Sequence, residues 1–520
     1  MLIRFKVSNF LSFNEQQEFS MIAGATKKKE NHLINNENLK LLKFSAVYGA
    51  NASGKSNLIK AVSFSKNIIL KGLSFNVAKL YCRINKNNKD KISSFEFEVK
   101  INNKFYAYGF DMLLSENSIQ AEWLYELDKP KNKEVLIYTR KLNEEINLNE
   151  KYFDNVEEII NRINVYYSDM KSQDNILFLT IMNKNKETMY KEFPDNHIKI
   201  FQDLYLWFKN TLTIIFPQGK LDNTPYFSSE ENIGKINEII STFGTGISEC
   251  KAVKSNMQEL KDNIPPDILN DMINTIEKSY IENVKNNEKA IIQQASIRIN
   301  REMYILKRSM DHLTIEKIVL KHKNNDSEYS FSEESDGTQR LFDLIEVLIS
   351  KNKEKVYLID ELDRCLHPKL TFEFVKRFLS NFEDENTQLV VTTHESRLLD
   401  FDLLRRDEIW FANREKYGPT QLYSLEEYNE RFDKKIDKAY MRGRYGGVPI
   451  FETLFPIGEV EGRKTMLAKE LDIIKTKDGR IGTVLGVWFD TTGLEVEFSD
   501  TAPETETIDQ ADVLEIIKEA

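Results

Sequence analysis

The chain has 520 residues, which at roughly 150 residues per domain is enough for three to four structural units. Hydrophobic residues make up 41% and aromatic residues 11%, so a mainly disordered chain is excluded. The formal net charge of −10 provides no basic surface for nucleic acid through bulk charge alone. No run reaches 18 apolar residues, and polar residues interrupt the first apolar stretch. We therefore expect a cytoplasmic protein without a signal peptide or membrane contact.

The first third of the chain predicts a strand-rich region with one prominent helix. Apolar and polar residues alternate over residues 1–20, which indicates two short strands. A predicted strand at residues 42–48, a glycine-containing loop and a predicted helix at residues 55–70 follow in that order. Alternation returns between about 93 and 140 and predicts an antiparallel β lobe.

Helical patterns dominate the middle of the chain, from about residue 151 to residue 325. Alternating β and α signals then return between residues 329 and 430, which is typical of the second half of a parallel-sheet core. The sequence therefore predicts an α/β fold whose chain leaves the core for a helical insertion and comes back.

The C-terminal segment differs in composition from the rest of the chain. Residues 466–520 hold 5 Lys and Arg against 13 Asp and Glu, and no asparagine follows Asn429. Strands are predicted at residues 481–489 and 494–498. We expect a small acidic all-β module at residues 471–520 that is similar to an SH3-like barrel. Its charge could repel DNA, mimic DNA or aid solubility, and the segment could be a fused neighbouring reading frame.

Residues 49–56 read GANASGKS, which fits the pattern G-x-x-x-x-G-K-[ST] between a predicted strand and a predicted helix. Glycines let backbone N–H groups surround phosphates, and the helix N-terminus favours their negative charge. Lys55 would reach the β- and γ-phosphates, and Ser56 would bind Mg²⁺. The predicted ATP-binding residues are Gly49, Asn51, Ser53, Gly54, Lys55, Ser56 and Asn57.

An apolar run at residues 356–359 ends in two carboxylates, Asp360 and Glu361. A strand buried on both faces that ends in such a pair is typical of a Walker B motif. Asp360 would hold Mg²⁺ through water, and Glu361 would polarise the attacking water. The alternative is a core strand capped by two solvated acids.

Two further patterns discriminate between classes of nucleotide-binding protein. Residues 335–340 (SDGTQR) precede a predicted helix, and a predicted strand ends at His394. Each is common alone, because a Ser-x-Gly turn is usually a helix N-cap and a lone histidine is usually structural. The order of glycine loop, Ser-x-Gly turn, Asp-Glu strand and histidine strand is much less common.

In this order the motifs resemble those of ABC-type ATPases of the SMC and RecF kind. The chain looks closest to the stand-alone OLD-like ATPases of anti-phage and abortive-infection systems. The resemblance spans roughly residues 1–455, although SDGTQR is not the fuller LSGGQ signature of transporters. Its other supporting segments are residues 9–13, 207–208, 214–217, 360–363, 367–368, 393–394 and 442–447.

The resemblance implies a P-loop ABC-type ATPase head that works as a head-to-head homodimer. ATP bound at Lys55 of one protomer would be capped by Ser335 and Gly337 of the other. Asp363 would lie in the loop that crosses the interface, and His394 would contact the γ-phosphate as a catalytic switch. The family also has a glutamine that senses Mg²⁺, and Gln173 is our candidate for it.

The motifs, their spacing and the change in composition near the C-terminus together predict four domains. Lys55 and Gly337 are 282 residues apart, which is more than a compact transporter ATPase usually allows. The predicted helical insertion fills this gap and is a candidate docking surface for a separate effector protein. The domains are residues 1–150 (first half of the head, with the β lobe), 151–325 (helical insertion), 326–455 (second half of the head) and 471–520 (acidic β module).

Two functions remain open from the sequence. The first is an ATPase that hydrolyses ATP in a dimer to drive or gate a partner effector in anti-phage defence. The second is a DNA repair or maintenance ATPase of SMC or RecF type that acts directly on DNA, which would add nucleic acid to the partners. Residues 459–464 are similar to the start of a TOPRIM nuclease, but no Asp-x-Asp follows. We therefore expect no intact nuclease in this chain.

Overall fold

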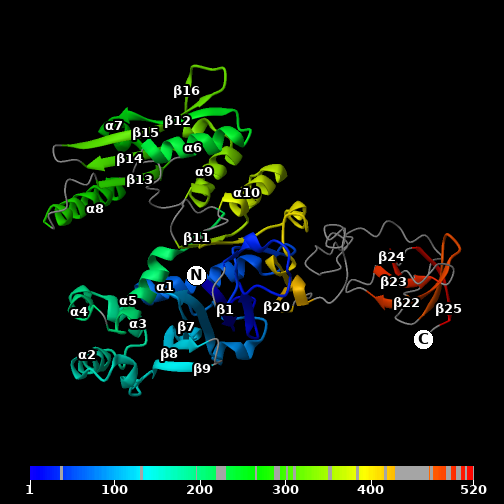
Figure 1. Cartoon of the computed structure of the whole chain (residues 1–520), viewed down its shortest axis with the longest axis horizontal. Helices are drawn as coiled ribbons and strands as arrows, with labels where there is room; N and C mark the ends of the chain where they lie inside the picture. The colour runs from blue at the N-terminus through cyan, green and yellow to red at the C-terminus, as the bar shows by residue number, and fades with distance from the viewer. Residues whose placement is uncertain are drawn as a thin grey trace. The chain divides into compact units, whose positions relative to one another are not determined.

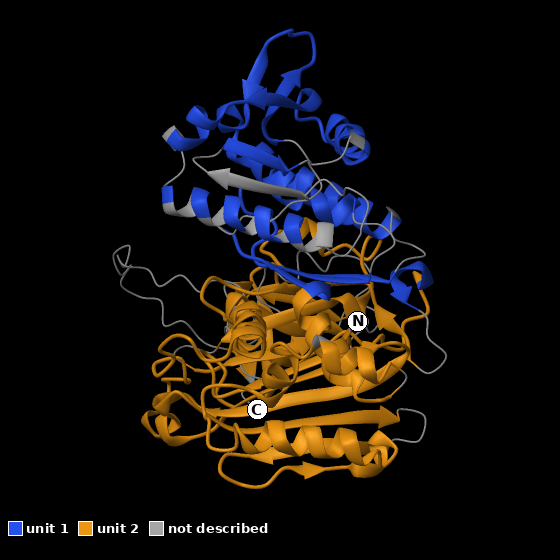
Figure 2. Cartoon of the chain, turned by 90° about the vertical axis from the view of Figure 1, so that its left-hand side faces the viewer, with its two compact units in different colours: residues 1, 30–36, 210–391 blue, residues 2–29, 37–209, 392–520 orange. Residues whose placement is uncertain are grey.

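The structure is a computed structural model in which the chain forms two compact units (Figure 2). Unit 2 contains residues 2–29, 37–209 and 392–520, and unit 1 contains residues 1, 30–36 and 210–391. Among the described residues, no helix combines the length and the apolar character needed to cross a membrane. The described residues are 1–34, 39–128, 133–194, 196–217, 230–263, 266–285, 293–299, 302–308, 312–349, 354–381, 386–414, 418–427, 468, 472–487, 493–498, 505–509 and 512–518.

The β lobe of unit 2 is a seven-stranded antiparallel sheet in the order β10-β9-β8-β7-β6-β1-β2 (Figure 1). Its alternating sequence produces one apolar face, on which the rings of Phe5 and Phe97 lie 4.6 Å apart and those of Phe95 and Phe110 lie 5.2 Å apart. The lobe is as predicted. Its strands are β1 (Leu2–Ser8), β2 (Gln17–Ser20), β6 (Ser93–Ile101), β7 (Lys104–Leu113), β8 (Ser118–Asp128), β9 (Lys133–Lys141) and β10 (Asn147–Leu148).

Helices α3 and α5, two of four helices that follow the lobe in the chain, pack against it through aromatic side chains. Tyr138 of β9 stacks on Phe201 with ring centroids 5.4 Å apart, and Phe178 lies edge-on to both rings. The predicted helical character after residue 151 is therefore present in unit 2. The helices are α2 (Glu157–Ser168), α3 (Phe178–Asn183), α4 (Glu187–Glu192) and α5 (Lys199–Leu206), followed by a π-helical turn (Trp207–Thr211).

Unit 2 also contains the strand and helix that flank the glycine loop. Strand β5 (Phe44–Tyr48) is wholly buried and runs parallel to β19 (Ile409–Arg414), and β20 (Thr420–Ser424) pairs antiparallel with β19. Helix α1 (Lys55–Lys71) begins directly after the loop. The two short strands β3 (Leu33–Ile34) and β4 (Leu41–Leu42) precede β5 in the chain.

Unit 1 holds a second set of parallel strands, in the order β11-β17-β18. The strands are β11 (Leu212–Ile215), β17 (Lys355–Ile359) and β18 (Thr387–Thr392). Helix α9 (Asp336–Ile349) precedes β17 in the chain, and helix α10 (Pro368–Asn381) lies between β17 and β18, so helices and strands alternate. Parallel strands with buried residues on both faces agree with the predicted α/β class.

The prediction of a helical insertion is wrong for a large part of unit 1, where an antiparallel sheet forms in the order β12-β15-β14-β13, with β16 paired to β15. Charged residues dominate this segment and masked the two-residue period of its apolar residues. Tyr304, Leu306 and Ile315 point to a core that helices α7 and α8 cover. The elements are α6 (Glu230–Thr242), β12 (Ile247–Ser255), α7 (Met257–Asn263), α8 (Pro266–Lys285), β13 (Gln293–Ile299), β14 (Glu302–Arg308), β15 (Leu313–His322) and β16 (Glu328–Ser330).

The C-terminal module is an antiparallel sheet in the order β24-β23-β22-β21-β25 with a small core of its own around Ile474, Val484 and Phe498. An all-β module was predicted here. Its strands are β21 (Ile473–Thr476), β22 (Ile481–Val487), β23 (Gly493–Phe498), β24 (Thr505–Asp509) and β25 (Val513–Lys518). Residues 442–447 and 459–464, singled out in the sequence, lie outside the described residues.

Candidate functional site

The glycine loop of unit 2 connects the end of β5 to the start of α1, which is the context that the motif requires. Ala52 (φ 64°) and Gly54 (φ 106°) both lie in the left-handed region, and this brings the chain into a tight turn before α1. Helix α1 begins at Lys55, so its N-terminus lies directly at the end of the loop. The arrangement favours a bound anion such as a phosphate chain.

Two glycines are required here because neighbouring atoms leave no space for a side chain. A Cβ atom at Gly49 would lie 2.3 Å from the carbonyl oxygen of Ala412, and one at Gly54 would lie 2.2 Å from Thr420 Oγ1. Substitution at Gly54 would also force a left-handed residue with a side chain. The loop is thus fixed by contacts with β19 and with the start of β20.

Lys55 is buried and its side chain turns back over the loop. Its Nζ donates hydrogen bonds to the carbonyl oxygens of Gly49 (2.8 Å) and Ala50 (2.9 Å). Among the described residues, the buried Ser53 Oγ has no hydrogen-bond partner. An ammonium held over the loop and a buried unpaired hydroxyl are groups that a triphosphate can use. The residues present therefore fit ATP.

Residues far apart in the sequence brace the loop. Asn57 Nδ2 donates to Ser12 Oγ (2.8 Å), and Thr420 Oγ1 hydrogen-bonds with both Ser12 Oγ (2.7 Å) and the Ser53 carbonyl oxygen (2.8 Å). Asn57 was predicted as a nucleotide contact, and its amide instead has a structural partner in this structure. Ser12 lies in the predicted NFLSF segment, but nothing in the sequence pointed to Thr420.

A cavity of 440 Å³ lies beside the loop, and its volume is within the range of small-molecule sites. Arg83 and Arg414 give it positive charge, and Tyr81 and Leu11 provide apolar surface. No local pattern in the sequence marks this cavity, because its residues come from four separate segments. It is lined by Leu11, Ser12, Asn57, Tyr81, Arg83, Ile84 and Arg414.

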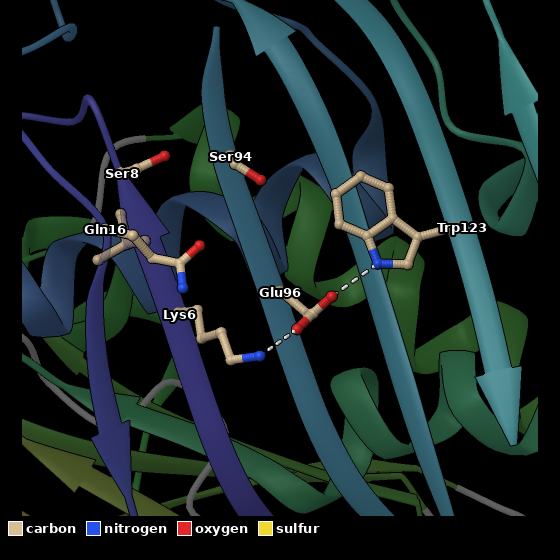
Figure 3. Close-up of a pocket in the computed structure, with 7 residues that line it drawn as sticks. Lys6, Ser8, Gln16, Ser94, Glu96 and Trp123 are labelled. Atoms are coloured by element: carbon tan, nitrogen blue, oxygen red, sulfur yellow. Dashed lines mark hydrogen bonds and ion pairs between the residues drawn. The ribbon is translucent and has the colours of Figure 1, made fainter. Parts of the chain in front are cut away.

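A second cavity of 250 Å³ lies on the β lobe (Figure 3). Lys6 Nζ and Trp123 Nε1 both donate to the carboxylate of Glu96, each at 2.8 Å. These three side chains therefore satisfy one another, and none of them is an unpaired group that needs a ligand.

Two further predicted residues lie in unit 2. The amide of Thr393 donates to the carbonyl oxygen of Val47 (3.1 Å), so the exposed His394 follows a residue fixed to β5 close to the glycine loop. Gln173 lies in the turn region after α2, where its Nε2 donates to the carbonyl oxygen of Asp169 (3.0 Å). The roles of His394 and Gln173 in nucleotide chemistry stay predictions.

The Asp-Glu pair lies at the end of β17 in unit 1. The Asp360 amide donates to the carbonyl oxygen of Ile215 (2.9 Å), which extends the pairing of β17 with β11 by one residue. Asp360 is 3% exposed, whereas the Glu361 side chain is 40% exposed. Glu361 also has a left-handed backbone (φ 50°), which is uncommon for a residue with a side chain. The chain therefore leaves the strand geometry directly after Asp360.

The Ser-x-Gly turn in the same unit caps helix α9. The Thr338 amide donates to Ser335 Oγ (3.2 Å), as in an N-cap. A Cβ atom at Gly337 would lie 2.7 Å from the carbonyl oxygen of Cys365, so the turn packs tightly on the loop that contains Asp363. Unit 1 therefore brings together Ser335, Gly337, Asp360, Glu361 and Asp363, while unit 2 holds the glycine loop and His394.

The predicted Mg²⁺ ligands are divided between the two units, with Ser56 in unit 2 and Asp360 in unit 1. Across the part of the chain that the structure describes, no group of three or more His, Cys, Asp or Glu side chains could hold a metal ion. Mg²⁺ in nucleotide sites is usually held by one or two protein groups together with the substrate phosphates. The assignment of Ser56 and Asp360 to Mg²⁺ stays a prediction.

Residues 44–232 and 245–400, more than half of the chain, match the family described as "AAA domain, putative AbiEii toxin, Type IV TA system". The chain belongs to this family. Its glycine loop and its Asp-Glu strand both lie within the residues that match this AAA-domain family. No curated protein matches it.

Solved structures with similar architecture include heads of SMC proteins. The SMC head bound to the C-winged helix domain of ScpA has 14% identity and a TM-score of 0.38, with 81% of this chain and 97% of that chain covered. The SMC head domain from Thermotoga maritima has 12% identity and a TM-score of 0.29, with 81% and 98% covered. Similarity at this level does not extend to activity or partners.

Proposed function

We propose that this chain binds and hydrolyses Mg·ATP as an ABC-type ATPase of the OLD-like kind and that a head-to-head dimer uses the reaction to drive or gate an effector. The observation that supports this best is the glycine loop. It joins a buried strand to a helix, holds the Lys55 ammonium over its carbonyl groups and contains an unpaired buried hydroxyl at Ser53. Such a loop is built for a triphosphate.

Each predicted site residue has a separate role in the proposed hydrolysis of ATP. The loop N–H groups and Lys55 bind the phosphates, and Ser56 and Asp360 hold Mg²⁺, which neutralises charge that develops on the phosphates. Glu361, whose carboxylate is partly exposed, polarises the attacking water. His394 contacts the γ-phosphate. Because phosphoryl transfer depends on positioning and on charge stabilisation, each of these contacts contributes to turnover.

A dimer is proposed because the Ser-x-Gly turn carries phosphate-binding features of its own. Ser335 and Asp336 are exposed at the N-terminus of the 14-residue helix α9, where the helix dipole favours an anion. The turn packs against the loop of Asp363 through Gly337. In the proposed dimer the turn of one protomer caps ATP in its partner, and the loop of Asp363 crosses the interface.

The effector is proposed to be a separate protein. The antiparallel sheet β12–β16 with helices α6–α8 is an insertion between the Walker motifs, so it provides a docking surface that hydrolysis can move. The family description names a toxin of a type IV toxin–antitoxin system, which is compatible with an anti-phage or abortive-infection role. The C-terminal acidic module is proposed to be dispensable for hydrolysis.

The proposal is tested by phosphate release from Mg·ATP. Wild-type protein is expected to hydrolyse ATP, Lys55→Ala to lose nucleotide binding, and Glu361→Gln to bind ATP without turnover. Lys60→Ala is the matched control, because Lys60 is an exposed lysine on the same helix. Hydrolysis that survives Lys55→Ala would contradict the proposal. ATP-stimulated DNA binding by the chain alone would favour an ATPase that acts directly on DNA.

A further inference from the structure

Arg340, in the second turn of helix α9, is a buried cation with very few partners. It is 4% exposed, and among the described residues its Nε and Nη1 atoms have no hydrogen-bond partner. Nη2 lies 3.5 Å from the carbonyl oxygen of Asp360, which is a long hydrogen bond. Burial lowers the pKa of Arg340, with Asp343 opposing that shift. A charge in such a site is unfavourable for folding.

Other buried arginines of the chain are paired differently. Arg405 is 2% exposed, and its Nε and Nη2 donate to both oxygens of Asp407 at 2.9 and 2.6 Å. Its Nη1 donates to the carbonyl oxygen of Lys28 at 2.5 Å. Arg405 thus stabilises the fold through a bidentate pair. No such bidentate pair is seen for Arg340 among the described residues, so a gain in folding stability does not explain why a buried arginine occupies this position.

The hydrogen bond of Arg340 lies at the point where β17 ends. The Asp360 carbonyl belongs to the peptide bond that leads into Glu361, whose φ of 50° departs from the strand geometry. A guanidinium beside this carbonyl favours the peptide orientation that the left-handed turn requires. The same helix begins with the Ser-x-Gly turn, whose Gly337 packs on the carbonyl of Cys365. Helix α9 therefore holds both ends of the loop at residues 360–365.

We propose that Arg340 is a positioning residue for ATP hydrolysis: it fixes the Asp360 carbonyl and so aims the Glu361 carboxylate at the attacking water. This inference rests on the proposed ATPase function. A displacement of about 1 Å in a reacting group costs up to about 100-fold in rate. Loss of the hydrogen bond from Arg340 would let the peptide between Asp360 and Glu361 shift, and the Glu361 carboxylate would shift with it. Arg340 does not itself contact the nucleotide, and it leaves ATP binding unchanged.

The test compares Arg340→Met and Arg340→Lys with wild type, using kcat and KM for ATP, equilibrium ATP binding and the thermal unfolding midpoint. Methionine has a similar length and removes an incompletely paired buried charge, so the midpoint is expected to stay constant or rise. The kcat value is expected to fall at least about tenfold, with KM and ATP affinity within about twofold. Arg340→Lys keeps the charge and is expected to retain part of the activity.

Arg405→Met is the matched control, because it removes another buried arginine, one whose Nε, Nη1 and Nη2 atoms all have hydrogen-bond partners. It is expected to lower the unfolding midpoint, since it leaves Asp407 buried and without its main partner. If Arg340→Met lowers the midpoint as Arg405→Met does, Arg340 is structural and the inference is wrong. An unchanged kcat in Arg340→Met would also overturn it.

Hydrogen exchange separates this inference from the proposed function. Arg340→Met is expected to speed amide exchange at residues 360–366 while exchange in the core of α9 stays constant. If wild-type protein hydrolyses no ATP, the proposed function fails, and the exchange at residues 360–366 then decides on Arg340. Unchanged exchange there would refute its positioning role.

Discussion

Replacing Glu122 by glutamine tests how one buried carboxylate holds the β lobe to the helices that follow it. Glu122 and Arg140 both have fully buried side chains and are joined at 2.9 Å. The carboxylate also fixes the start of α3. Its further hydrogen-bond donors are the hydroxyl groups of Tyr108 (3.0 Å) and Tyr138 (2.7 Å) and the amides of Phe178 (2.6 Å) and Leu179 (3.0 Å).

The expected loss follows from the charge that remains. Burial and the Glu122 carboxylate raise the pKa of Tyr108 and Tyr138 well above the usual value, so both hydroxyl groups stay protonated donors. Glutamine keeps the shape but loses the negative charge and offers an NH₂ group where two donors now point. Leaving Arg140 buried without its counter-charge costs about 3–5 kcal/mol. That corresponds to a change of at least about 100-fold in the opening equilibrium of the lobe.

The assay is hydrogen–deuterium exchange followed across strands β7–β9 and helix α3. Glu122→Gln is expected to speed exchange there at least about 100-fold at fixed pH, up to the limit set by global unfolding. Glu158→Gln is the matched control, because it breaks an exposed carboxylate–arginine pair with Arg162 at 2.7 Å. If Glu122→Gln changes exchange no more than Glu158→Gln does, the reasoning on the buried pair is refuted.

Two further predictions concern titratable groups. Burial raises the pKa of Asp111 above its usual 3.8, although a hydrogen bond with Ser94 opposes the shift. The folded state therefore binds this proton more tightly than the unfolded state does. The free energy of unfolding consequently falls as the pH rises from about 4 through the raised pKa. The unfolding midpoint of Asp111→Asn relative to wild type is therefore expected to be higher at pH 7 than at pH 3.5, and an equal difference at both pH values would contradict this. Cys365 is exposed, whereas Cys82 and Cys250 are buried, with the pKa of Cys250 raised to about 12 by burial. One thiol per native chain is expected to react rapidly with a disulfide reagent, and Cys365→Ser is expected to abolish that reaction; rapid reaction of two or three thiols would contradict the burial of the others.

The parts of the fold that could be predicted from sequence are those in which local pattern and long-range packing agree. The run GANASGKS can be recognised from local sequence alone, because its glycines, lysine and serine each have a separate role in binding a phosphate. The β lobe has clear two-residue alternation with apolar residues on one face. For these elements the local signal alone was sufficient.

The parts that could not be predicted depend on contacts between distant segments. Glu122 lies in a strand whose alternation gives it an inward position, but its partners come from β7, β9 and α3. Thr420 contacts the glycine loop although it lies 366 residues after Gly54 in the chain. The β12–β16 sheet was missed because its exposed face is densely charged, so the apolar residues of the other face were too few to separate a period of 2 from one of 3.6.

In the proposed dimer, ATP joins two copies of this chain through the glycine loop of one and the Ser-x-Gly turn of the other. The direct measurement is the solution mass of Glu361→Gln with and without Mg·ATP, because this variant is expected to retain bound ATP. Two variants in that background serve as controls. Lys55→Ala removes phosphate binding, and Ser335→Asp keeps the helix N-cap while adding a negative charge to the exposed turn. The mass of Glu361→Gln is expected to double when Mg·ATP is added. The mass of both control variants is expected to stay that of one chain. A mass that does not depend on ATP, or a doubling that survives Ser335→Asp, would contradict it.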